Sequence, residues 1–308
     1  TAQNVSDCTG TLIDARFNRL EFFIPKEISK DNILISEILF NPRPEGVDFV
    51  EIYNNSESPL DLQELYLANI SKDTIANKKQ VSKKQFLINP HQYLVLTVDP
   101  ENIRKEYFTE STSVFIKMAS LPAFNDDKGT VVLLSKNRVI DRFDYSEKMH
   151  FQLIKDPEGI SLERSSFSRA SNEPGNFRSA TASSGFATPG YKNSQAVNEI
   201  SFEDEFKLRS KTFSPDNDGY EDELEISYRF QNPGWVANIS VYNEKGVLVK
   251  KLLNNFTLSS DGIVNWDGFD ENSKISPVGI YLIYVDLFDA EGKTKRYRKT
   301  CVLAQQLN

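Results

Sequence analysis

The sequence predicts an all-β protein made of β-sandwiches in tandem. Short apolar runs recur along the chain, and each ends at Asn, Pro, Gly or Ser, as strands joined by tight turns do. Phe and Tyr are frequent, with 21 and 12 residues, whereas helical periodicity is confined to one short segment. A chain of 308 residues is about twice as long as a typical domain, so we expect two full domains with separate cores.

The first 28 residues cannot form a core by themselves. They contain a turn around Cys8 and one strand-like run at 20–25. We interpret residues 1–28 as the terminal strand of a preceding immunoglobulin-like domain, or as a segment that docks on the next domain of the chain.

Residues 29–195 form the first full unit. A Pro at the first turn and helical spacing predict a short helix over 100–108, and 135–138 is typical of a hairpin turn. The stretch 165–195 is rich in Ser, Asn, Gly, Pro and Ala, and we expect a long loop that wraps this unit. Strands are expected at 33–40, 49–54, 65–68, 92–98, 114–116, 130–134, 139–145 and 160–163.

Residues 196–308 form the second unit, with cleaner alternation. Every second residue is apolar from 224 to 230 and again from 237 to 241, which predicts strands with one buried face. The turn at 243–246 predicts a hairpin, with Gly246 in the left-handed region. Further strands are expected at 247–252, 262–266, 280–288 and 295–303. About seven strands is the number expected of one immunoglobulin-like sandwich.

Several motifs of the first unit resemble the lamin tail domain, an immunoglobulin-like module. The opening strands are Ile33-Leu-Ile-Ser-Glu-Ile-Leu-Phe-Asn, Asp48-Phe-Val-Glu-Ile-Tyr-Asn, and Leu60-Asp-Leu with Leu65-Tyr-Leu. Gly159-Ile-Ser-Leu-Glu-Arg and Ala187-Thr-Pro-Gly-Tyr-Lys-Asn-Ser resemble the closing segment of the bacterial branch. The coiled-coil rod of nuclear lamins has no counterpart here. The resemblance therefore implies a bacterial binding module and no filament protein.

The second unit resembles the immunoglobulin-like domain of FlgD-like proteins. The motifs are Phe213-Ser-Pro-Asp-Asn-Asp-Gly, Trp266-Asp-Gly and Pro277-Val-Gly-Ile-Tyr. This module recurs at the C-termini of large surface and secreted proteins of the Bacteroidota. The two resemblances together imply a Bacteroidota-type protein that is secreted, held at the cell surface or periplasmic, with upstream domains of the same polypeptide as partners.

One acidic loop is a candidate metal site. Asp216, Asp218 and Asp222 offer hard oxygen ligands on a tight loop, as calcium sites do, but the twelfth position of a full EF-hand pattern is Ser227. Two interpretations stay open, a calcium site and a polar turn whose Asp side chains bond backbone amides. A second acidic turn at 267–272 leaves the same choice. No other cofactor is expected.

The carboxylates and histidines form no recognisable catalytic constellation. Glu37, Asp48 and Glu51 lie on or beside neighbouring strands, and we expect them at strand edges, bonding turns and backbone amides. His91 and His150 have no partner at metal-ligand spacing, and we expect them to be surface or half-buried residues. The sequence has no Gly-x-Ser-x-Gly elbow and no Gly-rich phosphate loop. We therefore expect no enzyme.

Charge and cysteine content limit the partners. A net charge of −8 opposes binding to nucleic acid, and no apolar run is long enough to span a membrane. The lysines at 78–84 could touch an anionic polymer, although a solvated loop is the simpler interpretation. Asp73-Thr-Ile resembles an O-glycosylation acceptor. Cys8 and Cys301 are either two unconnected thiols or a bridge between the terminal segments.

These observations favour a non-catalytic structural or adhesion module of the cell envelope or surface. Exposed strand edges and loops would bind a protein or glycan. The alternative is a targeting or accessory C-terminal part of a larger secreted hydrolase, such as a nuclease, phosphatase or protease. A third hypothesis is a surface rod stiffened by calcium.

Overall fold

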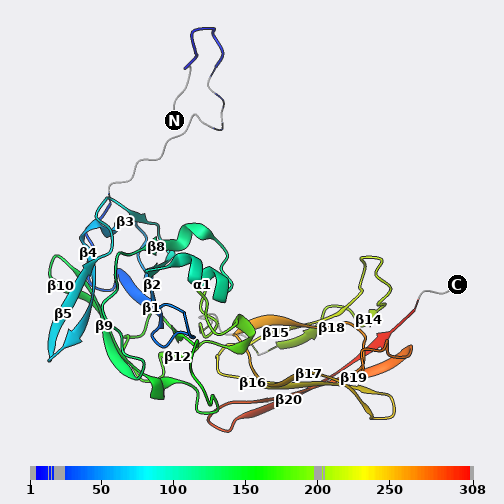
Figure 1. Ribbon diagram of the computed structural model, residues 1–308. Coiled ribbons are helices and arrows are strands. Elements are labelled where there is room, and N and C mark those ends of the chain that lie inside the picture. Colours follow the sequence, from blue (N-terminus) through cyan, green and yellow to red (C-terminus); the bar gives the residue numbers. More distant parts are fainter. Residues whose placement is uncertain are drawn as a thin grey trace.

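Two β-sandwiches follow one another along the chain (Figure 1). The computed structural model describes residues 5–12, 14, 16, 25–197, 203 and 205–305. Each sandwich has its own apolar core, one drawn from residues 28–177 and the other from residues 206–303. The predicted all-β fold of tandem immunoglobulin-like sandwiches is confirmed.

The first sandwich packs a six-stranded sheet against a four-stranded one. The larger sheet has the order β12-β11-β1-β2-β7-β8, and the smaller has the order β10-β9-β4-β5. The larger sheet contains β1 (Ile33–Leu39), β2 (Phe49–Asn54), β7 (Tyr93–Thr97), β8 (Phe115–Lys117), β11 (Leu162–Arg164) and β12 (Phe177–Ser179). The smaller contains β4 (Leu65–Ser71), β5 (Thr74–Gln80), β9 (Lys128–Ser135) and β10 (Arg138–Ser146), and β3 (Leu60–Asp61) pairs separately with β6 (Leu87–Ile88).

Short helical segments connect these strands. The predicted helix is present as α1 (Pro100–Glu106), where Asp99 accepts a hydrogen bond from the Glu101 amide and Pro100 occupies the first turn. The other helical segments are single 3₁₀ turns: η1 (Leu62–Glu64), η2 (Thr112–Val114), η3 (Glu147–Met149) and η4 (Ala182–Ser184).

Two strands lie where the sequence predicted loops. Residues 74–80 form β5, the edge of the smaller sheet, so Lys78 and Lys79 sit on a strand and not in a loop. Lysines on an edge strand discourage pairing with other chains, which explains why this strand looks polar. β12 lies inside the predicted wrapping loop. Phe177 fixes it to the core by stacking on Phe143 with ring centroids 3.7 Å apart.

The second sandwich packs a three-stranded sheet on a five-stranded one. The sheet β13-β15-β18 contains β13 (Glu205–Leu208), β15 (Leu224–Arg229) and β18 (Asp261–Trp266). The sheet β14-β20-β19-β16-β17 contains β14 (Thr212–Phe213), β20 (Thr294–Leu303), β19 (Gly279–Phe288), β16 (Val236–Asn243) and β17 (Leu248–Thr257). The alternating residues predicted to face inward are buried.

A tryptophan lies at the centre of this second core. The Trp266 side chain is fully buried between Phe213 and Tyr281, whose ring centroids are 5.2 and 5.0 Å away. Its indole Nε1 donates to the Phe269 carbonyl oxygen at 3.0 Å. The Trp266-Asp-Gly motif thus combines a core residue with the turn that follows β18.

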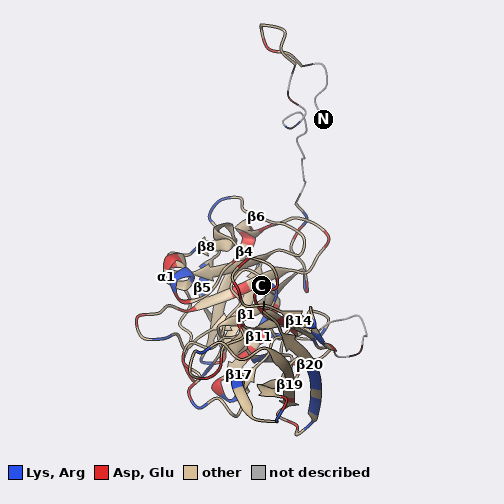
Figure 2. Cartoon of the chain, turned by 90° about the vertical axis from the view of Figure 1, so that its right-hand side faces the viewer, with Lys and Arg blue, Asp and Glu red and all other residues tan. Residues whose placement is uncertain are grey.

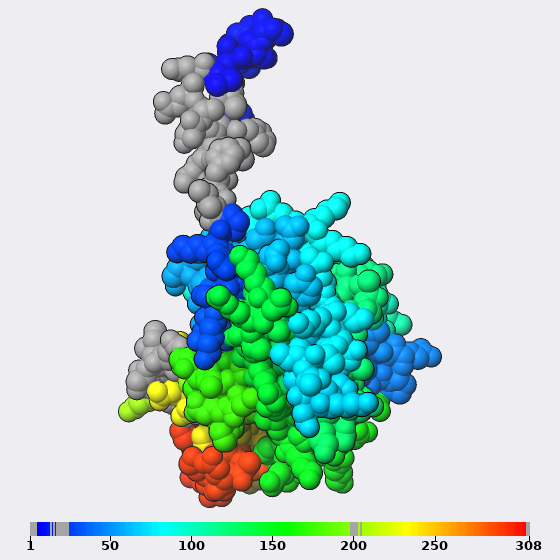
Figure 3. Space-filling view, turned by 90° about the vertical axis from the view of Figure 1, so that its left-hand side faces the viewer, coloured from blue at the N-terminus to red at the C-terminus, as the bar shows by residue number. Residues whose placement is uncertain are grey.

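Of the described N-terminal residues, 26–28 contact the first sandwich. Residues 5–12 form a small turn that stands apart from the body of the molecule (Figure 3). The Lys26 amide donates to the Pro59 carbonyl, and Ile28 is buried in the first core. The strand predicted at 20–25 lies, except for Pro25, outside the described residues.

The segment 180–195, here called the closing segment, joins the two sandwiches. It lies across the larger sheet of the first sandwich and also bonds the second. The Ala182 amide donates to Thr257 Oγ1 at 2.7 Å, the Ser259 amide donates to Ser183 Oγ at 2.8 Å, and the Ser260 amide donates to the Ser194 carbonyl at 3.0 Å.

Candidate functional sites

The acidic turn, defined as Asp216, Asp218 and Asp222, brings its three carboxylates together. One oxygen from each lies within 4.8 Å of the others. Backbone amides of the loop already use several of these oxygens: Asp216 accepts from the Asp218 amide, Asp218 from the Tyr220 amide and Asp222 from the Gly219 amide. The set has the hard oxygen chemistry that calcium requires, and these same bonds would hold the loop as a polar turn.

The second acidic turn is a hydrogen-bonded hairpin. Asp270 Oδ1 accepts from the amides of Asn272 and Lys274, at 2.8 and 2.9 Å, and these bonds lower the pKa of Asp270. Asp267 accepts from the Phe269 amide at 3.0 Å. The carboxylates of Asp267 and Asp270 thus accept hydrogen bonds from backbone amides of the turn itself.

Three carboxyl groups form a row across the larger sheet of the first sandwich. Glu37 on β1 is paired in register with Glu163 on β11 and with Glu51 on β2. All three side chains have no exposed surface. The prediction that Glu37 and Glu51 sit at strand edges is therefore wrong, because both lie on central strands beneath the closing segment.

The closing segment supplies most of the donors to this carboxyl row. The Thr188 amide donates to Glu37 Oε1 at 2.9 Å, and the Gly190 amide donates to Glu51 Oε2 at 2.6 Å. Glu163 Oε2 accepts from Ser194 Oγ at 2.7 Å and from the Gln195 amide at 2.9 Å. The expected bonding of Glu37 and Glu51 to backbone amides is present, through an element far away in sequence.

The hydrogen bonds of the Thr188 hydroxyl indicate which of the carboxyl groups of Glu37 and Glu163 is protonated and which is negatively charged. It lies 2.8 Å from Glu163 Oε1 and 3.3 Å from Glu37 Oε2, yet it has one proton to donate. Donation to the nearer Glu163 leaves the Thr188 oxygen as an acceptor, which a protonated Glu37 satisfies. Glu163, which accepts three bonds, is the better place for a negative charge.

The pKa values follow the same order. Burial, and then the charge of Glu163, raise the pKa of Glu37 to about 8. Burial raises the pKa of Glu163 to about 7, against the hydrogen bonds from Ser194 and Thr188. Burial, and then Glu37, raise the pKa of Glu51 well above its usual value. At neutral pH the carboxyl row is largely protonated. Its hydrogen bonds with the closing segment therefore hold that segment on the larger sheet.

A buried arginine, Arg164, follows Glu163 on β11, next to the carboxyl row. Arg164 is 1% exposed, donates from Nε to the Ile35 carbonyl at 2.7 Å and pairs with Asp141 Oδ2 at 3.0 Å. The Ser171 hydroxyl accepts a hydrogen bond from Arg164 Nη2 and donates one to Asp141 Oδ1. Sequence reasoning missed this clamp together with Glu163. The motif Gly159-Ile-Ser-Leu-Glu-Arg, in which a strand ends in two consecutive charged residues, was the signal that could have indicated it.

The remaining candidate residues lie apart from one another. Asp48 is half-buried, and burial followed by the charge of Asp126 raises its pKa to about 7. His91 is exposed at a positive φ of 58° and lies 3.0 Å from the Tyr53 hydroxyl. His150 is only 7% exposed, more deeply buried than predicted, and burial lowers its pKa to about 4.

The cysteines and the basic residues make no metal or phosphate site that the described residues reveal. Both thiols are free, with Cys8 exposed and Cys301 buried on β20. Lys78 donates to Asn137 Oδ1 at 3.2 Å on the smaller sheet. Figure 2 shows basic and acidic residues interspersed over the chain, with basic residues gathered on β20. Among the described helices, none has the length and apolar character needed to cross a membrane.

Comparison with known families identifies both sandwiches. The family described as Lamin Tail Domain matches residues 26–147, and the family described as CHU_C Type IX secretion signal domain matches residues 207–302. A search of curated proteins found no match.

Similar solved structures align with this chain at low identity and over different shares of its length. They include FlgD from P. aeruginosa (23% identity, 26% of this chain and 62% of that chain, TM-score 0.22) and CopC from Methylosinus trichosporium OB3b (13%, 34% and 98%, TM-score 0.23). Dimeric latent PorU from Porphyromonas gingivalis is also similar (9%, 84% of this chain and 18% of that chain, TM-score 0.27). This chain thus spans less than two thirds of the FlgD and PorU chains, and the family matches alone carry the assignment.

These matches confirm the resemblance of the first sandwich to lamin tail domains, and they relate the second sandwich to a family described as a secretion signal domain. The chain carries a lamin tail domain followed by a type IX secretion signal domain, and it is a secreted or cell-surface protein.

Proposed function

We propose that the chain is a non-catalytic adhesion module of the cell surface that holds a protein or glycan partner. Both matched domains are non-catalytic modules, which supports this proposal. The observation that carries it is an apolar and aromatic surface left exposed on the second sandwich.

This surface, the outer-face patch, lies on the side of the five-stranded sheet that faces away from the core. Strand β19 alternates, so Tyr281 and Ile283 are buried while Ile280 is 57% exposed. Val302 on β20 is opposite Ile280 in register and is 37% exposed. The patch consists of Tyr242, Leu248, Ile280, Leu282, Tyr284 and Val302.

The patch has the composition of a binding surface. Its aromatic members Tyr242 and Tyr284 meet edge to face at 6.5 Å, and the Arg298 guanidinium lies 5.7 Å from the Tyr284 ring. Arg296 and Asp286 form an ion pair of 3.0 Å on the same face. Aromatic residues and arginine within a polar rim are typical of protein interfaces, and contiguous exposed apolar surface is uncommon on isolated domains.

The carboxyl row supports a non-catalytic role for the first sandwich. General acid–base catalysis requires a carboxyl that touches the substrate. Glu37, Glu51 and Glu163 are completely covered by the closing segment, which excludes substrate from all three. Their raised pKa values therefore have a structural cause in burial.

Binding to envelope material tests this function. The labelled chain is incubated with bacterial envelope fractions and a glycan array, and Ile280→Asp is expected to reduce retention about tenfold or more, since it places a charge in the patch. The control Ile263→Asp alters an equally exposed isoleucine, 61% exposed, on the other sheet and should bind as wild type. Absence of binding to every fraction and glycan, together with hydrolytic turnover, would contradict the proposal.

A second candidate is that the chain serves as the C-terminal targeting part of a larger secreted hydrolase. The match of residues 207–302 to a secretion signal family favours it, because such a domain directs the export of an attached cargo. The test is the reading frame upstream of the codon for Thr1. A nuclease, phosphatase or protease domain there, active in the full polypeptide, would support this candidate, and its absence would exclude it.

A further inference from the structure

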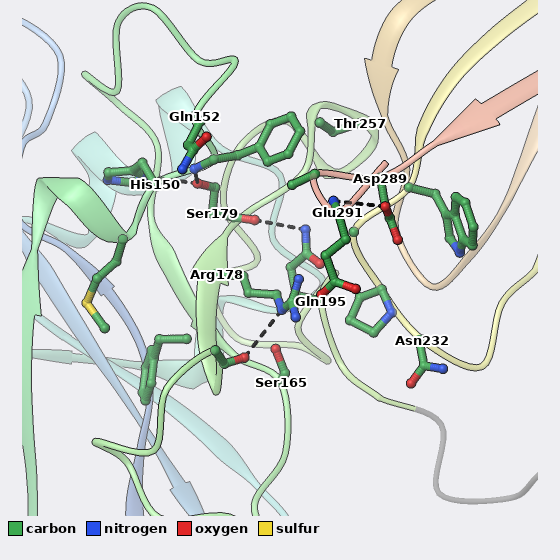
Figure 4. A pocket seen from close by; sticks show the side chains of 18 of the residues that line it. His150, Gln152, Ser165, Arg178, Ser179, Gln195, Asn232, Thr257, Asp289 and Glu291 are labelled. Atoms are coloured by element: carbon green, nitrogen blue, oxygen red, sulfur yellow. Dashed lines mark hydrogen bonds between the residues drawn. The ribbon is translucent and has the colours of Figure 1, made fainter. Parts of the chain in front are cut away.

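A cleft of about 970 Å³ lies between the two sandwiches (Figure 4). The first sandwich contributes β12, residues 148–152 and the end of the closing segment. The second contributes residues 232–235 and the β19–β20 turn at 289–295. This volume is at the upper end of the range for ligand sites, which are often formed between domains.

Three buried polar atoms of residues that line the cleft lack a hydrogen-bond partner among the described residues. They are His150 Nε2, Ser165 Oγ and Gln195 Oε1, on residues that are 7%, 4% and 5% exposed. Gln195 is held by its Nε2, which donates to the Ser179 carbonyl at 2.9 Å, so its oxygen is directed away from β12. Buried polar atoms are nearly always bonded, so these atoms call for a ligand that supplies hydrogen-bond partners.

The cleft is basic although the whole chain is acidic. Its basic residues are Lys148, Arg169, Arg178, Lys293 and Lys295, and its acidic residues are Asp289 and Glu291. Both acidic groups are already engaged: Asp289 Oδ1 accepts from two amides of its own turn, and Glu291 pairs with Lys293 at 2.6 Å.

Arg178 reaches across the cleft with most of its donors unused. Its Nε donates to the Gly175 carbonyl at 3.3 Å, and its two terminal nitrogens make no hydrogen bond in the part of the chain that the structure describes. A side chain at Gly234, on the opposite wall, would lie 3.2 Å from Arg178 Nη1, so the guanidinium contacts that backbone closely.

Lys293 is the second cation of this arrangement. Glu291 raises the pKa of Lys293, while the guanidinium of Arg178 acts in the opposite direction. Lys293 is already paired with Glu291, whereas the two terminal nitrogens of Arg178 have no partner among the described residues and are available to an anionic group.

We propose that this cleft binds an acidic saccharide, with a carboxylate on Arg178 and hydroxyl groups on Ser165 and Gln195. Gln195 Oε1 is an acceptor and needs a donor, which the hydroxyls of a sugar supply and a fully ionised simple anion does not. Phe151 and Pro233 add apolar surface against which a sugar ring packs. This inference goes beyond the proposed function, because the cleft is a second binding site apart from the outer-face patch.

Calorimetric titration of the whole chain with digalacturonate, and with galactobiose as the neutral match, tests the inference. Digalacturonate is expected to bind about tenfold or more tightly than galactobiose. Arg178→Ala should weaken it about tenfold or more, since a bidentate charged pair is lost. Ser165→Ala breaks no side-chain hydrogen bond within the described residues, so its weaker binding would report on the ligand. Arg209→Ala, the same charge change on exposed β13–β14 surface, should bind as wild type.

Several results would overturn the inference. They are equal affinity for the two disaccharides, equal weakening by Arg178→Ala and Arg209→Ala, competition by acetate at matching concentration, and equally tight binding of a triglutamate peptide. Unchanged melting temperatures show that the variants fold. If Arg178→Ala does not fold, Arg178→Lys replaces it, because lysine keeps the positive charge but lacks the two parallel donors of the guanidinium. Ile280→Asp is expected to leave digalacturonate binding unchanged, so the cleft and the outer-face patch can fail independently.

Discussion

Replacing Glu37 with Gln is expected to remove the contribution of Glu37 to the pH dependence of the first sandwich's stability, whereas the contributions of Glu51 and Glu163 remain. Burial and the neighbouring Glu163 raise the pKa of Glu37 from 4.5 to about 8. Between these values the folded protein keeps a proton that the unfolded chain releases. The contribution of Glu37 to the free energy of unfolding is therefore complete below pH 4.5 and is lost as the pH rises through 8.

The size of the effect follows from that change in pKa. At about 1.4 kcal/mol per unit, the wild-type sandwich loses up to about 4–5 kcal/mol between pH 5 and pH 9 through Glu37 alone. This value is an upper bound, because the closing segment can open and admit water before the whole sandwich unfolds. Gln has the shape and donor of the protonated carboxyl, so Glu37→Gln should cost about 1 kcal/mol or less at pH 5.

Differential scanning calorimetry at pH 5 and pH 9 measures this difference for each sandwich. Trp235 and Trp266, the two tryptophans of the chain, both belong to the second core, so tryptophan fluorescence assigns its transition. The other transition should fall sharply at pH 9 in wild type and in the exposed control Glu64→Gln, and by a smaller amount in Glu37→Gln, where Glu51 and Glu163 still titrate. An equal fall in all three proteins, or no fall in wild type, would refute the argument.

Three further predictions concern other parts of the chain. Gly190→Ala is expected to destabilise the first sandwich by about 2–4 kcal/mol, because φ is +91° and the new methyl group would overlap Val114; an unchanged melting temperature would contradict this. We propose that the acidic turn binds calcium weakly, so about 10 mM calcium should stabilise the second sandwich by about 1.4 kcal/mol for a dissociation constant of about 1 mM, and Asp216→Asn should abolish the gain. If calcium leaves wild type unchanged, the loop is only a polar turn. A thiol reagent should label Cys8 in the native chain and Cys301 only after denaturation, since burial raises the pKa of Cys301 to about 12; rapid native labelling of both would disprove the burial.

The sequence by itself determined the strands of both sandwiches and their class. Alternation in β15 and β16, and the apolar runs that became β1 and β2, were sufficient because one face of each strand must be buried. The hairpin turn at Lys136 and Asn137 was predictable because polar residues with an Asn stand between two apolar runs, and Asn tolerates the positive φ that the turn requires. The three carboxylates of the acidic turn are adjacent in sequence, and their grouping could be predicted for the same reason of locality.

Only the tertiary structure decided what the polar residues do. Glu37, Glu51 and Glu163 are separated by up to 126 positions, and strand register together with the closing segment turns them into one buried row. Composition made residues 165–195 look like a solvated loop, yet their hydroxyl and amide groups satisfy buried carboxylates and carbonyls. The cleft likewise depends on how two sandwiches with separate cores meet, which no local pattern encodes. Local periodicity specifies which face of a strand is buried, whereas the pairing of buried polar groups depends on contacts between distant segments.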